Sequence, residues 1–158
     1  SRLDAIEENY DYVEIDFLEL ITSCAERLDA IAAKNNVKIS VNNLSKNIII
    51  YSDEEKLSRA ITNIISNCIR YADSTITIIS NINFDGKLDI TISDDGSGFD
   101  KDDIPHIFDR FYRGKKGKFG LGLSISKNII EKLHGTITAG NGKKGAEFSI
   151  ELPVKNAK

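Results

Sequence analysis

The predicted strand over residues 88–94 ends on a carboxylate that is expected to face the core. Residues 88–92 alternate between apolar and polar side chains, and Asp94 continues the apolar series. A buried, ionised carboxylate costs several kcal/mol unless donors surround it. Asp94 either caps its own turn, which contains Gly96 and Gly98, or accepts a hydrogen bond from an exocyclic amine such as that of adenine, with the glycines letting the backbone approach a flat ring. The residues alone leave both interpretations open.

A second group of polar side chains shares one face of a predicted helix over residues 52–72. Asn63, Asn67, Arg70 and Tyr71 are spaced at i, i+4, i+7 and i+8, which places them on one side, next to an apolar stripe. Asparagine is a poor residue for a helix interior, so the joint pattern favours a site over a solvated face, although a solvated face is the simpler interpretation for any single residue. A carboxamide oxygen suits Mg²⁺, which takes few protein ligands when it binds together with a nucleotide.

A cluster of cations precedes a predicted helix that starts at residues 120–123, Gly-Leu-Gly-Leu. These cations are Arg110, Arg113, Lys115, Lys116 and Lys118. Free amides at a helix N-terminus bind phosphate, and lysines beside them would screen its charge; the alternative is a solvated surface loop. The chain has no Gly-x4-Gly-Lys-Ser/Thr loop, no Gly-x-Gly-x-x-Gly after a strand and no His-Arg-Asp run. A nucleotide site here would therefore be neither a P-loop nor a Ser/Thr kinase site.

The elements that must position these residues follow from periodicity and turn signals. Capping patterns at Asp16 with Glu19 and at Ser52 with Glu55 open two helices, and the third helix ends at His134-Gly135. Strands are predicted over residues 13–15, 37–41, 48–51, 75–84, 88–94, 136–139 and 146–152. Asp85-Gly86 joins the central pair as a hairpin. We therefore expect an α+β two-layer α/β sandwich, with a mixed, mostly antiparallel sheet packed against three helices.

Composition fits one globular domain. The chain has 158 residues, of which 41% are hydrophobic and 28% charged, and its formal net charge of −3 argues against a duplex-binding protein. Cys24 and Cys68 fall on apolar helix stripes, which is typical of core residues, and His106 and His134 have the settings of structural residues. No apolar run approaches the roughly 20 residues needed to span a bilayer, so we expect a soluble, cytoplasmic domain.

Taken in order, four motifs resemble those of the catalytic ATP-binding domain of bacterial sensor histidine kinases, in the GHKL superfamily shared with gyrase B subunits, MutL and the large heat-shock chaperones. Residues 63–71 are similar to the asparagine box and residues 94–98 to the first glycine box. Residues 107–113 resemble the phenylalanine box, and residues 120–123 the second glycine box. The resemblance covers nearly the whole chain and implies a Bergerat-type fold.

The resemblance also implies roles for individual residues. Asn67 would hold the magnesium ion that bridges the ATP phosphates, and Asp94 would recognise the adenine amino group. Arg113 and the loop after it correspond to the ATP lid, which would cover the phosphates. The residues implied to bind nucleotide are Asn63, Asn67, Arg70, Tyr71, Asp94, Gly96, Gly98, Tyr112, Arg113, Gly120, Leu121, Gly122 and Leu123. No residue of this chain is assigned a catalytic role with certainty.

By the same resemblance, the chain would transfer the γ-phosphoryl group of ATP to a histidine on a separate dimerisation domain. Residues 1–10 would be the end of a connector helix from that domain, and residues 11–155 the catalytic domain. The partners implied are the protein's own dimerisation domain in a homodimer and a response regulator, with no nucleic acid and with a bacterial inner membrane reached only through upstream segments. The alternatives are a non-kinase GHKL ATPase or a nucleotide-sensing module. Asn63 stands where the ATPases carry a glutamate base, which favours the kinase.

Overall fold

The computed structural model describes residues 9–112, 114 and 121–155. The expectations for residues 1–8, for Arg113, Lys115, Lys116, Lys118 and Gly120, and for the side chain of Leu121 lie outside the described residues. In chain order the elements are β1 (Tyr12–Asp16), α2 (Phe17–Lys34), β2 (Lys38–Asn43), β3 (Ile49–Asp53), α3 (Glu54–Tyr71), β4 (Thr75–Ile82), β5 (Leu88–Asp94), the 3-10 helix η1 (Ile104–His106), α4 (Leu121–Lys132), β6 (Thr136–Asn141) and β7 (Ala146–Leu152).

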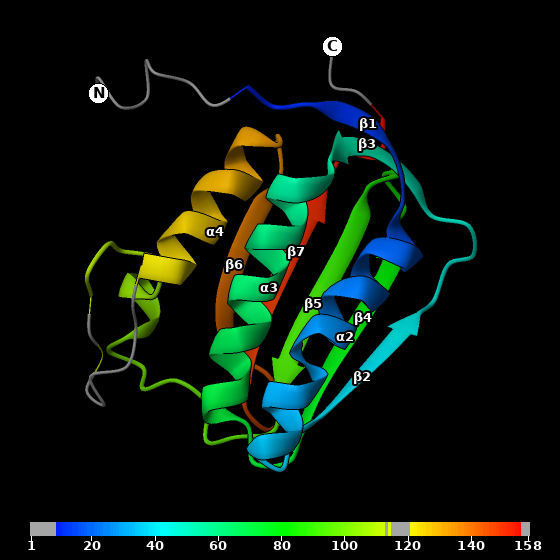
Figure 1. The fold of residues 1–158 in the computed structure, drawn as a ribbon. Coiled ribbons are helices and arrows are strands. Elements are labelled where there is room, and N and C mark those ends of the chain that lie inside the picture. The colour runs from blue at the N-terminus through cyan, green and yellow to red at the C-terminus, as the bar shows by residue number, and fades with distance from the viewer. Residues whose placement is uncertain (1–8, 113, 115–120, 156–158) are drawn as a thin grey trace.

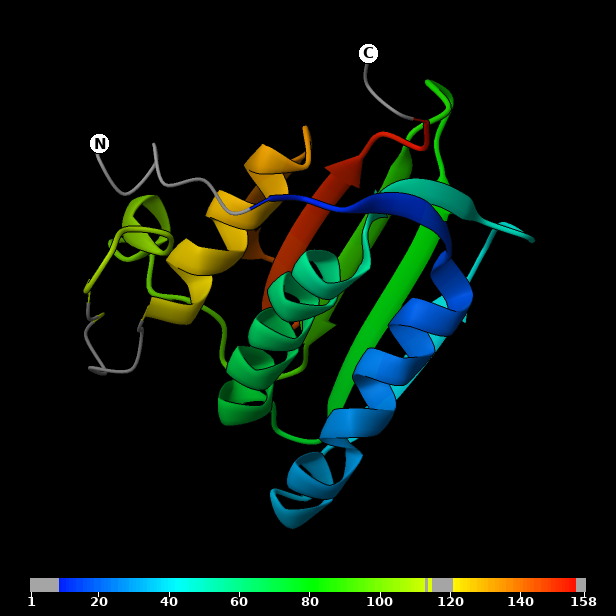
Figure 2. The same cartoon turned by 45° about the horizontal axis from the view of Figure 1, so that its top comes forward.

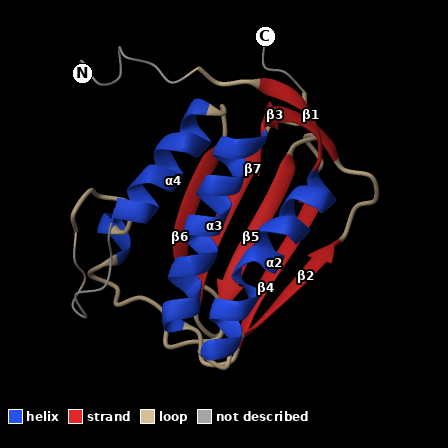
Figure 3. Ribbon diagram, viewed as in Figure 1, coloured by secondary structure: helices blue, strands red, loops and turns tan. Residues whose placement is uncertain are grey.

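Five strands form one sheet in the order β2-β4-β5-β7-β6, while β1 and β3 pair separately as an antiparallel ribbon. The β2–β4 pair is parallel and the other pairs of the large sheet are antiparallel. The three α-helices of the described residues cover one face of this sheet (Figure 1 and Figure 2). Colouring by secondary structure shows the same two layers, with the β1–β3 ribbon at one end (Figure 3). The predicted α+β sandwich is confirmed.

The core lies between the helices and the sheet. Leu57, Ile61, Ile64 and Ile65 of α3 are fully buried, as their helical spacing predicts. Burying each such side chain contributes about 1.5–3 kcal/mol before entropy is counted. Cys24 and Cys68 are free and fully buried, which confirms that both are core residues. None of the described helices is long and apolar enough to cross a membrane.

The first turn of α3 is capped by Asp53, so the prediction that Ser52 is the cap was wrong by one residue. Asp53 Oδ1 accepts from the Lys56 amide at 2.9 Å, whereas Ser52 still belongs to β3 and pairs with Val13. Both residue types make good caps, and β3 ends at Asp53, two residues beyond the end of the predicted strand. The cap of α2 is Asp16, as predicted, with Oδ1 accepting from the Glu19 amide at 3.3 Å.

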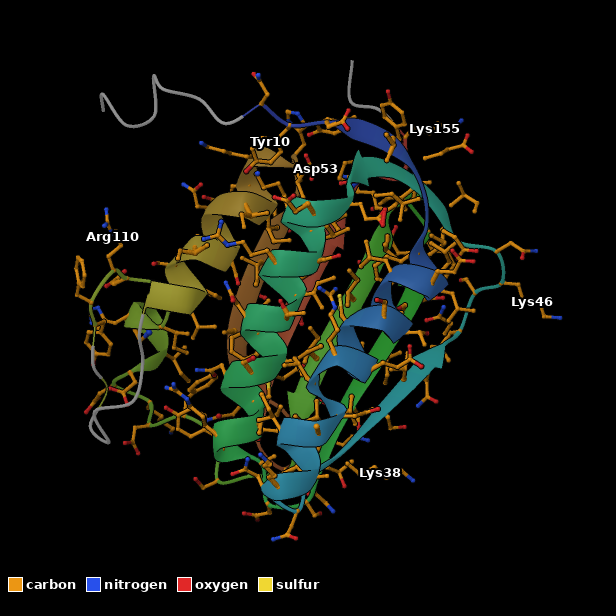
Figure 4. All side chains as sticks on the ribbon, viewed as in Figure 1. Tyr10, Lys38, Lys46, Asp53, Arg110 and Lys155 are labelled. Atoms are coloured by element: carbon orange, nitrogen blue, oxygen red, sulfur yellow. The ribbon has the colours of Figure 1, made fainter. Side chains whose placement is uncertain are left out.

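Both ends of the described chain are attached to β3. The Asp11 amide donates to Asp53 Oδ2 at 2.7 Å, and the Tyr51 amide donates to the Val154 carbonyl at 2.9 Å. Figure 4 shows Tyr10 and Asp53 close together above the start of α3. The ribbon is thus held both by the entering chain and by the residues that follow β7.

Candidate nucleotide-binding site

Asp94 points inward, as the strand alternation predicts. Its side chain lies at the end of β5 and the residue is only 6% exposed. Oδ1 accepts hydrogen bonds from the Gly96 amide at 2.9 Å and from the Ala146 amide at 3.2 Å. Burial raises the pKa of Asp94; these two amides offset part of that rise, and the charges of Asp95 and Asp73 add to it. The carboxylate is therefore supported at one oxygen while remaining costly to ionise.

The second carboxylate oxygen of Asp94, Oδ2, is free to accept a hydrogen bond from a ligand. Oδ2 is buried, and no described residue donates a hydrogen bond to it with ordinary geometry. The Cys68 thiol of α3 lies near the carboxylate: burial raises the pKa of Cys68, and the charge of Asp94 and a hydrogen bond between the two side chains raise it further. A thiol is only a weak donor, so this contact does not satisfy the oxygen. Leaving a buried acceptor unpaired costs about 1–3 kcal/mol, so an N–H group brought here by a ligand would recover that cost.

The two glycines after Asp94 are required by protein packing. A Cβ at Gly96 would overlap the carbonyl oxygen of Tyr71, the last residue of α3. Gly98 has φ +80°, and a Cβ there would lie 2.6 Å from Asn141 Oδ1. The loop thus fits closely between the end of α3 and the end of β6. The sequence offered two reasons for these glycines, a turn capped by Asp94 and close approach to a ring, and the bond from the Gly96 amide to Asp94 Oδ1 shows the capped turn. Contact between the loop and neighbouring residues is a further reason for glycine.

The polar face of α3 meets the start of α4. Asn63 Nδ2 donates to the Gly122 carbonyl at 3.5 Å, a long hydrogen bond, and a Cβ at Gly122 would lie 3.9 Å from Asn63. The buried Ser126 hydroxyl of α4 donates to the Ala60 carbonyl at 2.9 Å, which fixes the two helices together. The asparagine-bearing face of α3 therefore has two neighbours. One is the loop after Asp94, which packs against the Tyr71 carbonyl, and the other is the first turn of α4, which contacts Asn63.

The other predicted residues of α3 and α4 differ in exposure. Asn67 and Tyr71 are half-buried and Arg70 is exposed. Leu123 is 2% exposed and belongs to the core, so its side chain packs inward and away from solvent. The described residues contain no group of three or more His, Cys, Asp or Glu side chains that could hold a metal ion. The carboxamide of Asn67 nevertheless fits a magnesium ion that arrives on nucleotide phosphates and keeps most of its waters.

Tyr112 is bound within its own loop. Its hydroxyl donates to Asp103 Oδ1 at 2.8 Å, and this hydrogen bond raises the pKa of Tyr112. The His106 ring stacks on the Tyr112 ring at 4.8 Å between centroids, and His106 Nδ1 lies 2.9 Å from Asp109 Oδ2. Phe111, next to Tyr112, is 67% exposed and has φ 63°, which is unusual for a non-glycine residue. The loop thus carries its own polar network.

Sequence reasoning missed three residues of the β6–β7 hairpin. A Cβ at Gly145 would overlap Asp94 Oδ1, and the Ala146 amide binds the same oxygen. Asn141 binds both backbone groups of Phe99, with Oδ1 accepting from the amide at 2.7 Å and Nδ2 donating to the carbonyl at 3.0 Å. In the sequence, Asn141 and Gly145 lie between the predicted strands 136–139 and 146–152, and Ala146 opens the second strand; the only signal was a glycine directly before a strand.

Asp95 fastens the other side of the loop. Its carboxylate accepts from the amides of residues 73–75 at 2.9–3.0 Å and from the Ser74 hydroxyl at 2.6 Å. Burial pushes the pKa of Asp95 upward, but the hydrogen bonds from Ser74, Thr75 and Asp73 outweigh it and hold the pKa well below the usual range. Asp94 and Asp95 therefore differ. Asp94 is buried and accepts amide hydrogen bonds at one oxygen only, whereas Asp95 accepts hydrogen bonds at both oxygens.

A polar groove lies elsewhere, between β1, the start of α2 and the first half of α3. Its lining carries more acidic than basic side chains and includes Asp16, Glu19, Glu55 and Arg59. None of the described residues predicted to bind nucleotide lines this groove. The candidate site is thus the region around Asp94, the polar face of α3 and the start of α4.

Residues 52–156 match the family model described as histidine kinase-, DNA gyrase B-, and HSP90-like ATPase. The chain belongs to this family. The matched range contains every residue of the candidate site, from Asn63 to Ala146.

Relatives with similar sequences carry sensor names. The chain is 34% identical to sensor protein RprX of Bacteroides fragilis, over 98% of this chain and 32% of the relative. It is also 34% identical to sensor histidine kinase CssS of Bacillus subtilis, over 97% of this chain and 33% of the relative. The chain therefore spans about one third of the length of these curated relatives.

Solved structures show the same fold. The catalytic domain of histidine kinase ThkA superposes with a TM-score of 0.83 at 23% identity, covering 92% of this chain and 97% of that domain. Full-length ShkA in complex with AMPPNP superposes with a TM-score of 0.86 at 24% identity, covering 99% of this chain and 34% of that protein. At these identities the likeness establishes the fold, and it confirms the predicted two-layer architecture.

Proposed function

We propose that this chain is the ATP-binding catalytic domain of a sensor histidine kinase, which transfers the γ-phosphoryl group of ATP to a histidine on a separate dimerisation domain. The observation that carries the proposal is the buried Oδ2 of Asp94, near which the described residues offer no stronger donor than the Cys68 thiol. An adenine amino group supplies the N–H donor that this oxygen needs. The names of the relatives and the family match support the choice of a kinase.

In this proposal each part of the site has one task. Asp94 accepts from the adenine amino group, and the loop of Gly96 and Gly98 holds Asp94 in place. Asn67 holds magnesium on the phosphates, with Asn63, Arg70 and Tyr71 around it and Tyr112 at the edge of the site. Magnesium held by Asn67 would supply positive charge that neutralises the phosphates. The phosphates would be met by Arg113 and by residues 120–123, since free amides at the start of a helix stabilise negative charge.

The chemistry asked of these residues is positioning and charge neutralisation, which are the main requirements of phosphoryl transfer. The nucleophile comes from outside the chain. His106 is engaged with Asp109 and Tyr112 in its own loop, and His134 lies at the end of α4 with φ 67°. The acceptor histidine and its base therefore belong to the dimerisation domain.

The proposed parent protein is a homodimeric sensor that serves a response regulator. Residues 1–10 are the end of the connector from the dimerisation domain, and residues 11–155 form the catalytic domain. We place this domain in the cytoplasm and the parent protein in the bacterial inner membrane, anchored through segments upstream. The sensor names of relatives about three times longer than this chain support this arrangement.

Binding is tested by titrating the chain with a non-hydrolysable ATP analogue, with and without Mg²⁺. We expect magnesium-dependent binding that Asp94→Asn weakens by about 30-fold or more, because the buried acceptor is replaced by a donor at the adenine amine. Asp89→Asn is the matched control, since it removes the same charge from the partly exposed face of β5. Unchanged affinity in Asp94→Asn would refute adenine recognition by this residue.

The reaction class is tested with the full-length protein and γ-labelled ATP. We expect label on a histidine of the dimerisation domain, detected as acid-labile, base-stable phosphoprotein, and none in the Asp94→Asn protein. Release of the label only as inorganic phosphate would favour the ATPase alternative instead. Nucleotide binding without either product would favour a sensing module.

A further inference from the structure

The loop from Asp94 to Phe99, called the adenine loop below, is fixed at both ends by one cross-strand pair. Asn141 is the last residue of β6 and lies directly opposite Ala146, the first residue of β7. The Ala146 amide donates to Asp94 Oδ1, at the start of the loop. The Asn141 carboxamide binds Phe99, at the end of the loop. The end of the β6–β7 hairpin therefore spans the whole adenine loop.

We infer that Asn141 is a positioning residue for nucleotide recognition, which holds the adenine loop in the shape that aims Asp94. The inference rests on the proposed function. Asn141 Oδ1 accepts from the Phe99 amide at 2.7 Å, and Nδ2 donates to the Phe99 carbonyl at 3.0 Å. Pairing with both groups of one residue needs a donor and an acceptor on the same planar group, which a carboxamide supplies and a hydroxyl or a carboxylate does not.

The loop is shaped around this side chain. Gly98 has φ +80°, and a Cβ there would lie 2.6 Å from Asn141 Oδ1, so the backbone passes directly over the carboxamide. The Phe99 ring is 9% exposed and packs edge-on against Phe148 of β7, with 5.8 Å between centroids. The ring of Phe99 is thus held by the core, and its backbone by Asn141. Together they set the path of the chain between Phe99 and Asp94.

A loop that already has its binding shape loses less conformational entropy when the ligand arrives. Without the two hydrogen bonds from Asn141 to Phe99, the residues between Asp94 and Phe99 gain alternative backbone conformations. Asp94 Oδ2 then points toward the adenine amine in a smaller fraction of the molecules. The loss should fall on nucleotides that use the Asp94 hydrogen bond. A nucleotide with a carbonyl in place of the adenine amine gains little from Asp94 and should be affected less.

The test is a calorimetric titration of the 158-residue chain with Mg-ADP and with Mg-inosine diphosphate. We expect Asn141→Ala to bind ADP about tenfold more weakly, and its preference for ADP over inosine diphosphate to fall by the same factor. Asn141→Asp should lose at least as much, because its second oxygen would face the Phe99 carbonyl. Thr138→Ala, an exposed position on the same strand, is the control and should keep both affinities.

Two results would overturn the inference. One is ADP binding by Asn141→Ala within about twofold of the original chain. The other is an equal loss for both nucleotides, which indicates general loosening of the fold. Thermal unfolding shows whether Asn141→Ala is folded; if it is not, Asn141→Gln, which keeps both groups on a longer side chain, is titrated and should show a smaller fall in the same preference. An original chain with no preference for ADP would refute adenine recognition itself, and with it this role of Asn141.

Discussion

Asp94 has opposite consequences for folding and for binding. Burial raises its pKa, so the folded chain without nucleotide favours the protonated carboxyl more strongly than the unfolded chain does. Ionising a group whose folded pKa is raised lowers stability, and this loss appears as the pH rises through the folded pKa. At neutral pH the charged Asp94 is therefore a stability cost that the proposed hydrogen bond to nucleotide offsets.

Asp94→Asn should accordingly stabilise the chain in the absence of nucleotide. We expect a gain on the order of 1 kcal/mol in the free energy of unfolding at neutral pH. The gain should vanish below about pH 3.5, where the carboxyl is protonated in both the folded and the unfolded chain. Urea unfolding at the two pH values measures it. A variant less stable than the original at neutral pH would show that the Gly96 and Ala146 amides outweigh burial.

Gly96 offers a second comparison at the scale of one side chain. A Cβ would overlap the Tyr71 carbonyl, which belongs to backbone that cannot easily move, so Gly96→Ala should cost about 2–4 kcal/mol. Gly140→Ala is the matched control, because a Cβ there meets nothing within 4 Å, and its effect should stay within about 0.5 kcal/mol. Denaturant unfolding measures the free energy of unfolding of both variants and of the original chain. Equal stabilities would mean that the loop can shift away from α3.

At the scale of elements, α2 and α3 are both capped by an aspartate, but the two caps differ in exposure and in the number of amides they bind. Asp16 is exposed and makes one capping bond at 3.3 Å. Asp53 is 5% exposed and binds two amides, those of Lys56 at 2.9 Å and Asp11 at 2.7 Å. Only the second cap joins a helix to the chain that enters the domain.

Removing the two caps should therefore have unequal effects. We expect Asp53→Ala to lower the free energy of unfolding by about 2–3 kcal/mol, because it removes the shared acceptor of two partly buried amides. Asp16→Ala should cost about 0.5–1 kcal/mol. Chemical denaturation gives both values, and hydrogen exchange of the Asp11 amide should accelerate only in Asp53→Ala. Similar costs for the two variants would argue against the double role of Asp53.

Local patterns predicted these elements well. The apolar stripe of α3 is buried as its spacing requires, and the hairpin through Asp85-Gly86 joins β4 and β5 as expected. The start of α3 was misplaced because Ser52 and Asp53 are adjacent residues with the same capping chemistry. Such an error is local, since only the length of β3 decides between them.

At the scale of the whole molecule, the missed features are those that join distant segments. Asn141 binds a residue 42 positions earlier, and Ala146 binds one 52 positions earlier. No periodicity or turn signal marks such contacts, because they depend on how β7 is placed beside β5 in the sheet. The same holds for the parallel pairing of β2 with β4 and for the separate β1–β3 ribbon. Asp94 could be predicted from the sequence because the alternation along its own strand, residues 88–94, shows that it faces the core.

The attachment of both chain ends to β3 limits where this domain can be cut or joined to another. A version starting at Tyr12 would remove the amide that binds Asp53 Oδ2, and one ending at Leu152 would remove the carbonyl that accepts from Tyr51. Chimeras that join this domain to another protein's upstream segment should therefore cross over before Asp11 and retain Val154. A junction after Asp11 or before Val154 would remove hydrogen bonds that hold β3, the strand that leads directly into α3.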